Sequence, residues 1–206
     1  MMPVLIILSF LIGSIPTGLL IAKTKGIDLR KVGSGNIGAT NVLRAVGKEA
    51  ALFTLIGDIA KGALPVAIGK LFGLGIFDAG ILGISAILGH NFSLFLKFKG
   101  GKGVATSIGV LLAFSPHVAL LTITLWLLTA RWTRYSSLSA LVAFGLLPLS
   151  IYMLDYSNEK MVIAIAITVL IFVRHTANIK RLIQGTESKI GEKIGDRLKG
   201  KAKNYD

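Results

Sequence analysis

Residues 104–130 read VATSIGVLLAFSPHVALLTITLWLLTA, an apolar run of 27 residues that is interrupted in its middle by Ser115, Pro116 and His117. A transmembrane helix needs about 20 residues. The run is therefore either one long, tilted span or a hairpin of two short helices. This choice decides how many times the chain crosses a bilayer.

The rest of the chain is apolar enough for a membrane protein. Its 206 residues are 53% hydrophobic, and the mean hydropathy is +0.73. Further apolar segments lie at roughly 3–22, 50–73, 78–96, 136–154 and 160–174, in long blocks rather than periodic stripes, which indicates that the bilayer is their solvent. The 24 glycines would let helices approach closely. We predict an all-α, polytopic membrane protein.

The basic residues decide between one span and a hairpin. They cluster in residues 23–48, 97–102, 131–134 and 174–206, and cytoplasmic loops are the ones enriched in Lys and Arg. A hairpin at 115–117 puts all four clusters on one side, whereas a single span would separate them. We therefore predict seven transmembrane helices, with the N-terminus outside and the C-terminus in the cytoplasm. The two short helices would need shielding by protein or by a water-filled cavity.

The formal charge of +13 would suggest nucleic acid in a soluble protein. Here the cations flank apolar spans, so orientation, lipid phosphates and an anionic substrate compete as explanations, and no nucleic-acid partner is predicted. The chain has no cysteine, which excludes disulfides and thiol nucleophiles. The first cations, Lys23 and Lys25, follow the first apolar segment, so that segment is expected to be retained rather than cleaved.

The first of three polar stretches is Gly33-Ser34-Gly35-Asn36-Ile37-Gly38-Ala39-Thr40-Asn41. Its glycines allow positive φ, so successive N–H groups could form an anion nest. Neutral donors come from the side chains of Ser34, Asn36, Thr40 and Asn41. Arg44 follows one helical turn after Thr40, and its planar fork suits a phosphate. The alternative is a flexible loop with a helix cap.

The second stretch, Lys99-Gly100-Gly101-Lys102-Gly103, opens an apolar helix. An anion there would meet helix-terminal N–H groups and the Lys102 ammonium. The alternative is a cytoplasmic turn whose lysines only set the topology.

The third stretch runs from Arg174 to Arg181. His175 and Asn178 share a helix face, with Arg174 and Arg181 on a neighbouring stripe. This pattern fits a phosphate clamp, or an interfacial helix that binds lipid headgroups. Glu187 could orient one of these cations or be solvated.

Other polar residues lie within apolar segments. Asp58 and Lys61 are three apart in the second segment and should form an ion pair, which either braces the bundle or lines the site. His90 and Asn91 close the third segment, where a capping role is as plausible as a catalytic one. Ser137, after an aromatic and basic turn, could add a hydroxyl donor.

Several enzyme signatures are missing. The three histidines are followed, five residues on, by Phe95, Thr122 and Lys180, so no His-x4-Asp pair exists, and the sequence has no Gly-x-Ser-x-Gly elbow and no metal-ligand spacing. The candidate site is thus rich in cations and donors but poor in bases. That suits an activated substrate with a good leaving group, for which the protein supplies mainly positioning and electrostatic stabilisation.

The three polar stretches, with Gly89-His90 and with Ile179-Lys180-Arg181-Leu182, resemble the bacterial acyl-phosphate:glycerol-3-phosphate acyltransferases from about residue 10 to Glu187. The resemblance implies a seven-span, multi-pass protein of the bacterial inner membrane with its active site facing the cytoplasm. It would transfer a fatty acyl group from acyl phosphate to position 1 of glycerol 3-phosphate, giving lysophosphatidate and phosphate. It implies no cofactor and no metal. Expected partners are the two substrates, membrane lipids and, as a candidate, the enzyme that makes acyl phosphate.

The resemblance also implies roles for particular residues. The expected catalytic residues are Ser34, Arg44, Lys102, His175 and Asn178. Together with the polar stretches themselves, the resemblance gives the expected substrate-binding residues, which are Gly33, Gly35, Asn36, Thr40, Asn41, His90, Gly100, Gly101, Gly103, Ser137, Arg181 and Glu187.

One other function stays open at this point. A small transporter or flippase for a phosphorylated substrate would show an inverted repeat with broken helices in both halves, and the break at 115–117 has no clear counterpart in the first half. We divide the chain into one membrane domain, 1–187, and a basic tail, 188–206. Ile190, Ile194 and Leu198 in the tail fit either an amphipathic helix or a solvated segment.

Overall fold

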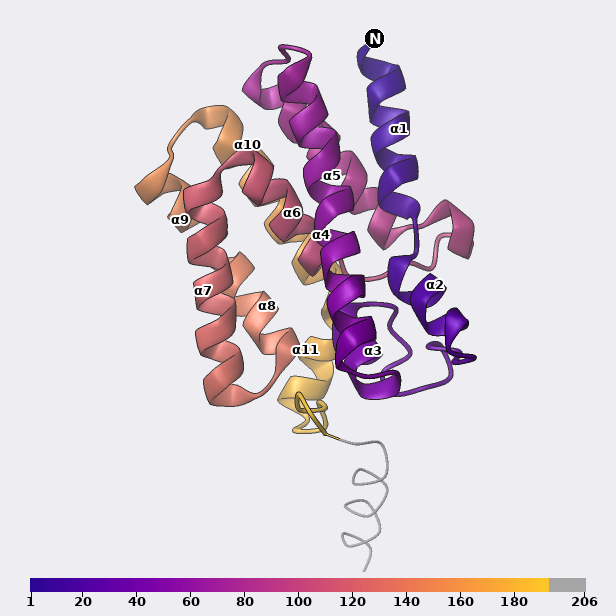
Figure 1. Ribbon diagram of the computed structural model, residues 1–206. Coiled ribbons are helices and arrows are strands. Elements are labelled where there is room, and N and C mark those ends of the chain that lie inside the picture. Colours follow the sequence, from indigo (N-terminus) through magenta and orange to yellow (C-terminus); the bar gives the residue numbers. More distant parts are fainter. Residues whose placement is uncertain (193–206) are drawn as a thin grey trace, which may run out of the picture.

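The computed structural model describes residues 1–192, and every regular element in that range is helical. The elements are α1 (Met2–Ser14), α2 (Thr17–Thr24), α3 (Ala39–Ala45), α4 (Lys48–Leu71), α5 (Ile76–Asn91), the 3-10 turn η1 (Leu94–Leu96), α6 (Val104–Phe114), α7 (Pro116–Thr133), α8 (Ser136–Gly145), α9 (Leu147–Leu154), α10 (Asn158–Arg174) and α11 (Thr176–Ile183). The N-terminus and α11 lie at opposite ends of the bundle (Figure 1).

The run at 104–130 is two helices, as predicted. Residue Ser115 lies between α6 and α7 in a non-helical conformation, and Pro116 is the first residue of α7, where its fixed φ suits a helix start. Figure 1 shows the chain reversing there into a hairpin. The 11 residues of α6 are only about 16 Å long, too short to span a bilayer alone.

Two other predicted segments are also broken. The first span divides at Pro16 into α1 and α2, and the segment at 136–154 bends by 41° between α8 and α9, next to Pro148. By length and composition, three helical stretches in the described residues could cross a membrane, or up to five if each bent pair is one span. The protein is therefore membrane-embedded, while the seven-span topology and its orientation stay predictions.

Glycine sets the closest helix contacts. A side chain at Gly62 of α4 would collide with the Thr106 carbonyl of α6, and one at Gly109 of α6 would collide with the Ile59 carbonyl of α4. The two helices therefore pack backbone to backbone, as small residues allow in membranes. This contact fixes the start of the short helix α6 against α4.

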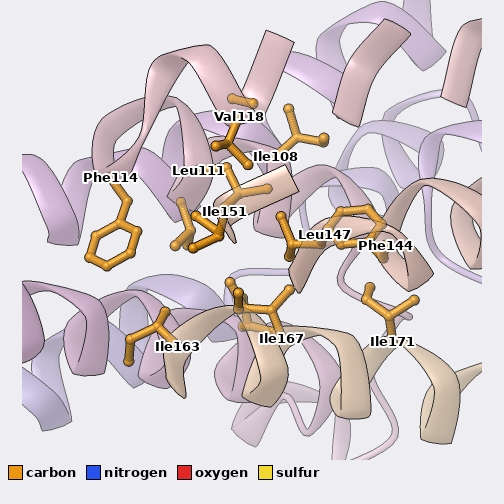
Figure 2. Packing of buried hydrophobic residues seen from close by; sticks show 14 of the residues in the cluster. Ile108, Leu111, Phe114, Val118, Phe144, Leu147, Ile151, Ile163, Ile167 and Ile171 are labelled. Carbon is orange, nitrogen blue, oxygen red and sulfur yellow. The ribbon is translucent and has the colours of Figure 1, made fainter. Parts of the chain in front are cut away.

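The main core lies between α5, α6, α7, α8, α9 and α10, and Val66 of α4 also belongs to it. Figure 2 shows its side chains interdigitating, among them Leu111, Phe144, Ile151 and Ile167. Many large apolar side chains on the outer faces remain exposed, for example Phe53, Leu120 and Val169. An apolar exterior of this kind fits contact with lipid rather than water.

Candidate active site

The three polar stretches meet around one cavity of about 540 Å³. The expected site residues that line it are Ser34, Asn36, Thr40, Asn41, Arg44, His90, Lys102, Gly103, Ser137, His175, Asn178 and Glu187. Gly33 and Arg181 instead line a smaller adjoining cavity of about 170 Å³. Gly35, Gly100 and Gly101 line neither cavity.

The other wall of the large cavity is apolar. Its residues are Leu52, Leu55 and Ile59 of α4, Val104, Ala105 and Ile108 of α6, and Ile123, Trp126 and Leu127 of α7. Leu52 and Leu127 are both 55% exposed. One cavity thus joins a cationic wall to an apolar wall, which fits a ligand with a charged head and an apolar tail.

Asn41 organises the first polar loop. Its Oδ1 accepts from the Ser34 N–H at 3.0 Å, and its Nδ2 donates to the carbonyls of Leu29, Val32 and Asn36 at 3.2, 3.0 and 2.9 Å. Gly33 has φ +63° and lies so close to Asn41 that a side chain would collide with it. The loop is therefore wound around one buried amide.

The anion nest predicted for this loop is wrong at three of its amides. The Ser34, Gly35 and Asn36 N–H groups donate to Asn41 Oδ1, to the Val32 carbonyl and to the Ser34 hydroxyl. Three donors that already have partners inside the loop do not point at a ligand. What the loop offers the cavity is the side chains of Ser34, Asn36 and Thr40, followed by Arg44.

The glycine turn at 100–101 is clamped on both sides. The N–H groups of Gly100 and Gly101 donate to the Asn91 and His90 carbonyls at 3.2 and 2.9 Å, so the last residues of α5 hold the turn. On the other side, the Arg174 guanidinium donates to the Gly101 carbonyl at 2.9 and 3.1 Å and to the Gly100 carbonyl at 3.3 Å. Arg174, expected in a phosphate clamp, thus positions this turn.

The turn delivers Lys102 and the start of α6 to the cavity. Gly103 caps α6 with φ +82°, and Val104 and Ala105 line the cavity. Within residues 1–192, no side chain caps the first N–H groups of α6. The first N–H groups of a helix carry a partial positive charge. Lys102 and a helix N-terminus therefore face the same space.

Lys102 is a cation among other cations. Burial and, to a smaller extent, the charges of Arg181, Arg44 and Arg174 together lower its pKa to about 8, while Glu187 acts in the opposite direction. The ammonium group is thus mostly charged at neutral pH, and an anion in the cavity would stabilise its charged form.

Glu187 ties the third polar stretch together. Its carboxylate accepts from Ser137 Oγ at 2.7 Å, Asn178 Nδ2 at 2.6 Å and Arg181 Nε at 2.7 Å. Burial acts to raise the pKa of the Glu187 carboxyl, but the bonds from Ser137, Arg181 and Asn178 hold the pKa below its usual value. Of the two possibilities left by the sequence, Glu187 orients Arg181 and is not solvated.

His175 lies at the bend between α10 and α11 and lines the large cavity. Its Nδ1 is 2.8 Å from the Ile171 carbonyl oxygen. A carbonyl only accepts, so Nδ1 carries the hydrogen and Nε2 is the acceptor atom of the neutral ring. The imidazole is held in one orientation with Nε2 available to a ligand.

Residues 186–190, here called the strap, cross the cavity wall. Arg44 Nη2 donates to the Ser188 and Lys189 carbonyls at 3.2 and 3.0 Å. The Ile190 N–H donates to the Arg134 carbonyl at 2.6 Å, and Arg134 Nη2 donates back to the Ile190 carbonyl at 3.2 Å. Ser188 and Ile190 line the large cavity. The start of the predicted tail therefore belongs to the site, while Ile194 and Leu198 lie outside the described residues.

The predicted ion pair of Asp58 and Lys61 is confirmed. The two side chains are 2.8 Å apart, with Asp58 2% and Lys61 5% exposed. Lys61 also donates to the Ile15 carbonyl at 2.7 Å, and the Thr17 hydroxyl donates to Asp58, so the pair braces the break between α1 and α2. Asp58 also lines the cavity, together with His90, whereas Lys61 does not, so the pair braces the bundle and only its carboxylate belongs to the cavity wall.

Comparison with known proteins gives one consistent result. The family model described as glycerol-3-phosphate acyltransferase matches residues 3–185. A glycerol-3-phosphate acyltransferase of Sinorhizobium fredii is 50% identical over 186 residues, covering 89% of this chain and 90% of the relative. One of Thermus thermophilus is 45% identical over 192 residues, covering 92% and 95%.

Two solved structures are similar in fold as well. Both are crystal structures of PlsY (YgiH), an integral membrane glycerol 3-phosphate acyltransferase. The glycerol 3-phosphate form has a TM-score of 0.88 at 43% identity, covering 92% of this chain and 96% of that one. The lysophosphatidic acid form has a TM-score of 0.86 at 41% identity, covering 92% and 95%.

Proposed function

The chain belongs to the glycerol-3-phosphate acyltransferase family, and from this premise we propose that it uses acyl phosphate as its donor. The acyl group would pass to the hydroxyl at position 1 of glycerol 3-phosphate, giving lysophosphatidate and inorganic phosphate. The observation that carries this proposal is that the large cavity has both a cationic wall and an apolar wall. Both substrates and the product carry a phosphate group. Acyl phosphate and lysophosphatidate also carry a long apolar chain.

The reaction needs no dedicated base on the protein. The hydroxyl oxygen attacks the acyl carbonyl carbon, the C–O bond of the ester forms, and the C–O bond to phosphate breaks. The proton of the hydroxyl passes to the departing phosphate, so charge and atoms balance. Phosphate groups bind a proton with a pKa of about 6, which makes the leaving group itself a suitable acceptor.

The protein would supply charge and orientation. Arg44, Lys102 and the α6 N-terminus would bind phosphate oxygens, since all three line the large cavity and carry positive charge or partial charge. Ser34 and Asn178 would add neutral hydrogen bonds. His175 Nε2, held by the Nδ1 contact, would accept a hydrogen bond from a glycerol hydroxyl. Held in this way, the reacting groups lose little further entropy in the transition state.

We place the protein in the bacterial inner membrane with the cavity reached from the cytoplasm. The basic clusters support this orientation through the positive-inside rule. The acyl chain would enter from the bilayer past Leu52 and Leu127, which are both exposed and part of the cavity wall. A transporter or flippase is not favoured, because the matched family consists of acyltransferases.

The direct test is purified protein with palmitoyl phosphate and glycerol 3-phosphate in the absence of coenzyme A. We expect lysophosphatidate and inorganic phosphate in equal amounts. A parallel reaction with palmitoyl-coenzyme A should give neither. Turnover with the thioester but not with the acyl phosphate would refute the proposed donor.

A further inference from the structure

Trp126 of α7 is a cavity residue that no motif predicted. Its ring packs against the main apolar core and lines the cavity between Ile123 and Leu127. Its indole Nε1 is buried and has no hydrogen-bond partner within residues 1–192. Trp126 therefore carries one unsatisfied buried donor next to the apolar cavity residues of α7.

An unsatisfied donor needs a reason. The indole nitrogen can only donate, and a buried tryptophan usually finds a partner. Leaving such a donor unpaired costs about 1–3 kcal/mol. Phenylalanine would provide a similar ring without this cost, so the N–H is explained best by an acceptor that a ligand brings.

The position of Trp126 restricts what that acceptor is. It lies seven residues before Thr133, the last residue of α7, which is about 10 Å along the helix. The other cavity side chains of α6 and α7 are apolar, and α4 adds Leu52, Leu55 and Ile59 as well as Lys48 and Asp58, whereas Arg44 and Lys102 belong to the cationic wall. A phosphate would be held by the cations. In an acyl phosphate, the polar group between the phosphate and the apolar tail is the acyl carbonyl.

We propose that the Trp126 indole N–H donates a hydrogen bond to the carbonyl oxygen of the acyl group. This inference rests on the proposed function. The same oxygen becomes an oxyanion when the glycerol hydroxyl attacks, and hydrogen bonds to charged acceptors are about twice as strong as neutral ones. The bond therefore strengthens in the transition state, which is the condition for raising kcat rather than only lowering KM.

The kinetic test compares two conservative variants. Trp126→Phe removes the N–H and keeps an aromatic ring, and Trp132→Phe changes the other tryptophan of the chain, which is 85% exposed. Removing one oxyanion donor lowers kcat by about 100- to 1000-fold, and a neutral bond is worth up to about tenfold. We expect Trp126→Phe to lose about 10- to 100-fold in kcat/KM for acyl phosphate, with the KM for glycerol 3-phosphate unchanged and Trp132→Phe active. Unchanged kinetics in Trp126→Phe would overturn the proposal.

A spectroscopic test does not depend on turnover or on the folding of Trp126→Phe. The Trp132→Phe protein keeps Trp126 as its one tryptophan, so its fluorescence reports on that indole. We expect an ester lysophosphatidate to shift the emission, while its ether analogue, which lacks the carbonyl, and glycerol 3-phosphate give a smaller shift or none. Equal spectra with the ester and ether ligands would show that the indole does not bind the carbonyl.

Two further measurements identify where the carbonyl comes from and distinguish failure of this proposal from failure of the proposed function. The ester carbonyl of a bilayer lipid has the same chemistry, so phospholipid alone is added first; a shift as large as that from lysophosphatidate would assign the donor to bulk lipid and overturn the proposal. If wild-type protein makes no lysophosphatidate from acyl phosphate, the proposed function fails, while the comparison of ester and ether ligands still decides the role of Trp126.

Discussion

Replacing Glu187 with glutamine tests whether the site depends on the contacts of one carboxylate. Glutamine keeps an oxygen that can accept from Ser137 and Asn178, but it puts an NH2 group against Arg181 Nε, which also donates. Breaking a fully buried ion pair costs 3–5 kcal/mol, whereas exposed pairs are worth about 0–1 kcal/mol. The Arg181 side chain is 35% exposed and that of Glu187 9%, so we expect an intermediate loss of about 1–2 kcal/mol.

This loss should weaken the attachment of the strap and lower the activity rather than destabilise the whole fold. If the lost energy is needed to hold Asn178 and the strap in place, Glu187→Gln reduces kcat/KM by about 5- to 30-fold. Glu187→Ala leaves Ser137 and Asn178 without an acceptor as well, at about 1–3 kcal/mol each. It should therefore lose more than about 100-fold.

The assay is lysophosphatidate formation together with thermal unfolding of each purified variant. Glu192→Gln is the matched control, because Glu192 is a nearby acid that accepts only from the Lys189 N–H, at 2.9 Å, in the described residues. It should retain activity within about twofold, as expected for a surface change. Equal activity of wild type and Glu187→Ala, or an effect of Glu192→Gln as large as that of Glu187→Gln, would refute the reasoning.

Three further predictions follow from single contacts. Because the Lys102 pKa is lowered to about 8, its charge is present below that pH and lost above it, so the KM for glycerol 3-phosphate should rise as the pH passes 8. The Lys102→Arg variant stays charged and should move that rise to higher pH. Identical KM profiles of the two proteins would contradict the role of the ammonium group. Gly101→Ala places a methyl group against a buried imidazole of α5, which should cost about 1–3 kcal/mol and most of the activity, whereas Gly75→Ala, with open space around it, should change neither melting temperature nor rate. Lys61→Met leaves the Asp58 carboxylate buried without its ammonium partner and should destabilise the protein by about 3–5 kcal/mol. Adding Asp58→Asn should recover part of the lost melting temperature. A lower melting temperature in the double variant than in Lys61→Met would show that the broken pair is not the cause.

Features encoded locally could be predicted from the sequence. The hairpin break at Ser115 was predictable because short apolar runs and basic clusters restrict the topology. The pairing of Asp58 with Lys61 was predictable because two charges one helical turn apart in an apolar helix have no better partner. The three polar stretches were recognisable because each combines small residues with cations.

Features that depend on long-range contacts could not be predicted. Nothing in the first loop shows that its N–H groups bond to Asn41 and Val32 instead of a ligand. The sequence assigns residues 188–190 of the strap to the tail, because their partners, Arg44 and Arg134, are distant in sequence. Trp126 lies in an apolar helix without a motif, and only the fold shows that its N–H is buried. The seven-span count and the roles of individual site residues stay predictions.

The crowding of cations around the cavity has a consequence for folding. Arg44, Arg174 and Arg181 all act to lower the pKa of Lys102, and Glu187 is the carboxylate that opposes them. Such repulsion opposes the folded state until an anion enters. A ligand present at 100 times its Kd stabilises a protein by about 2.7 kcal/mol. We therefore expect the proposed substrate to act as a folding aid as well, so that the protein would be hardest to purify in phosphate-free buffer and its lifetime in the membrane would follow the cellular supply of glycerol 3-phosphate.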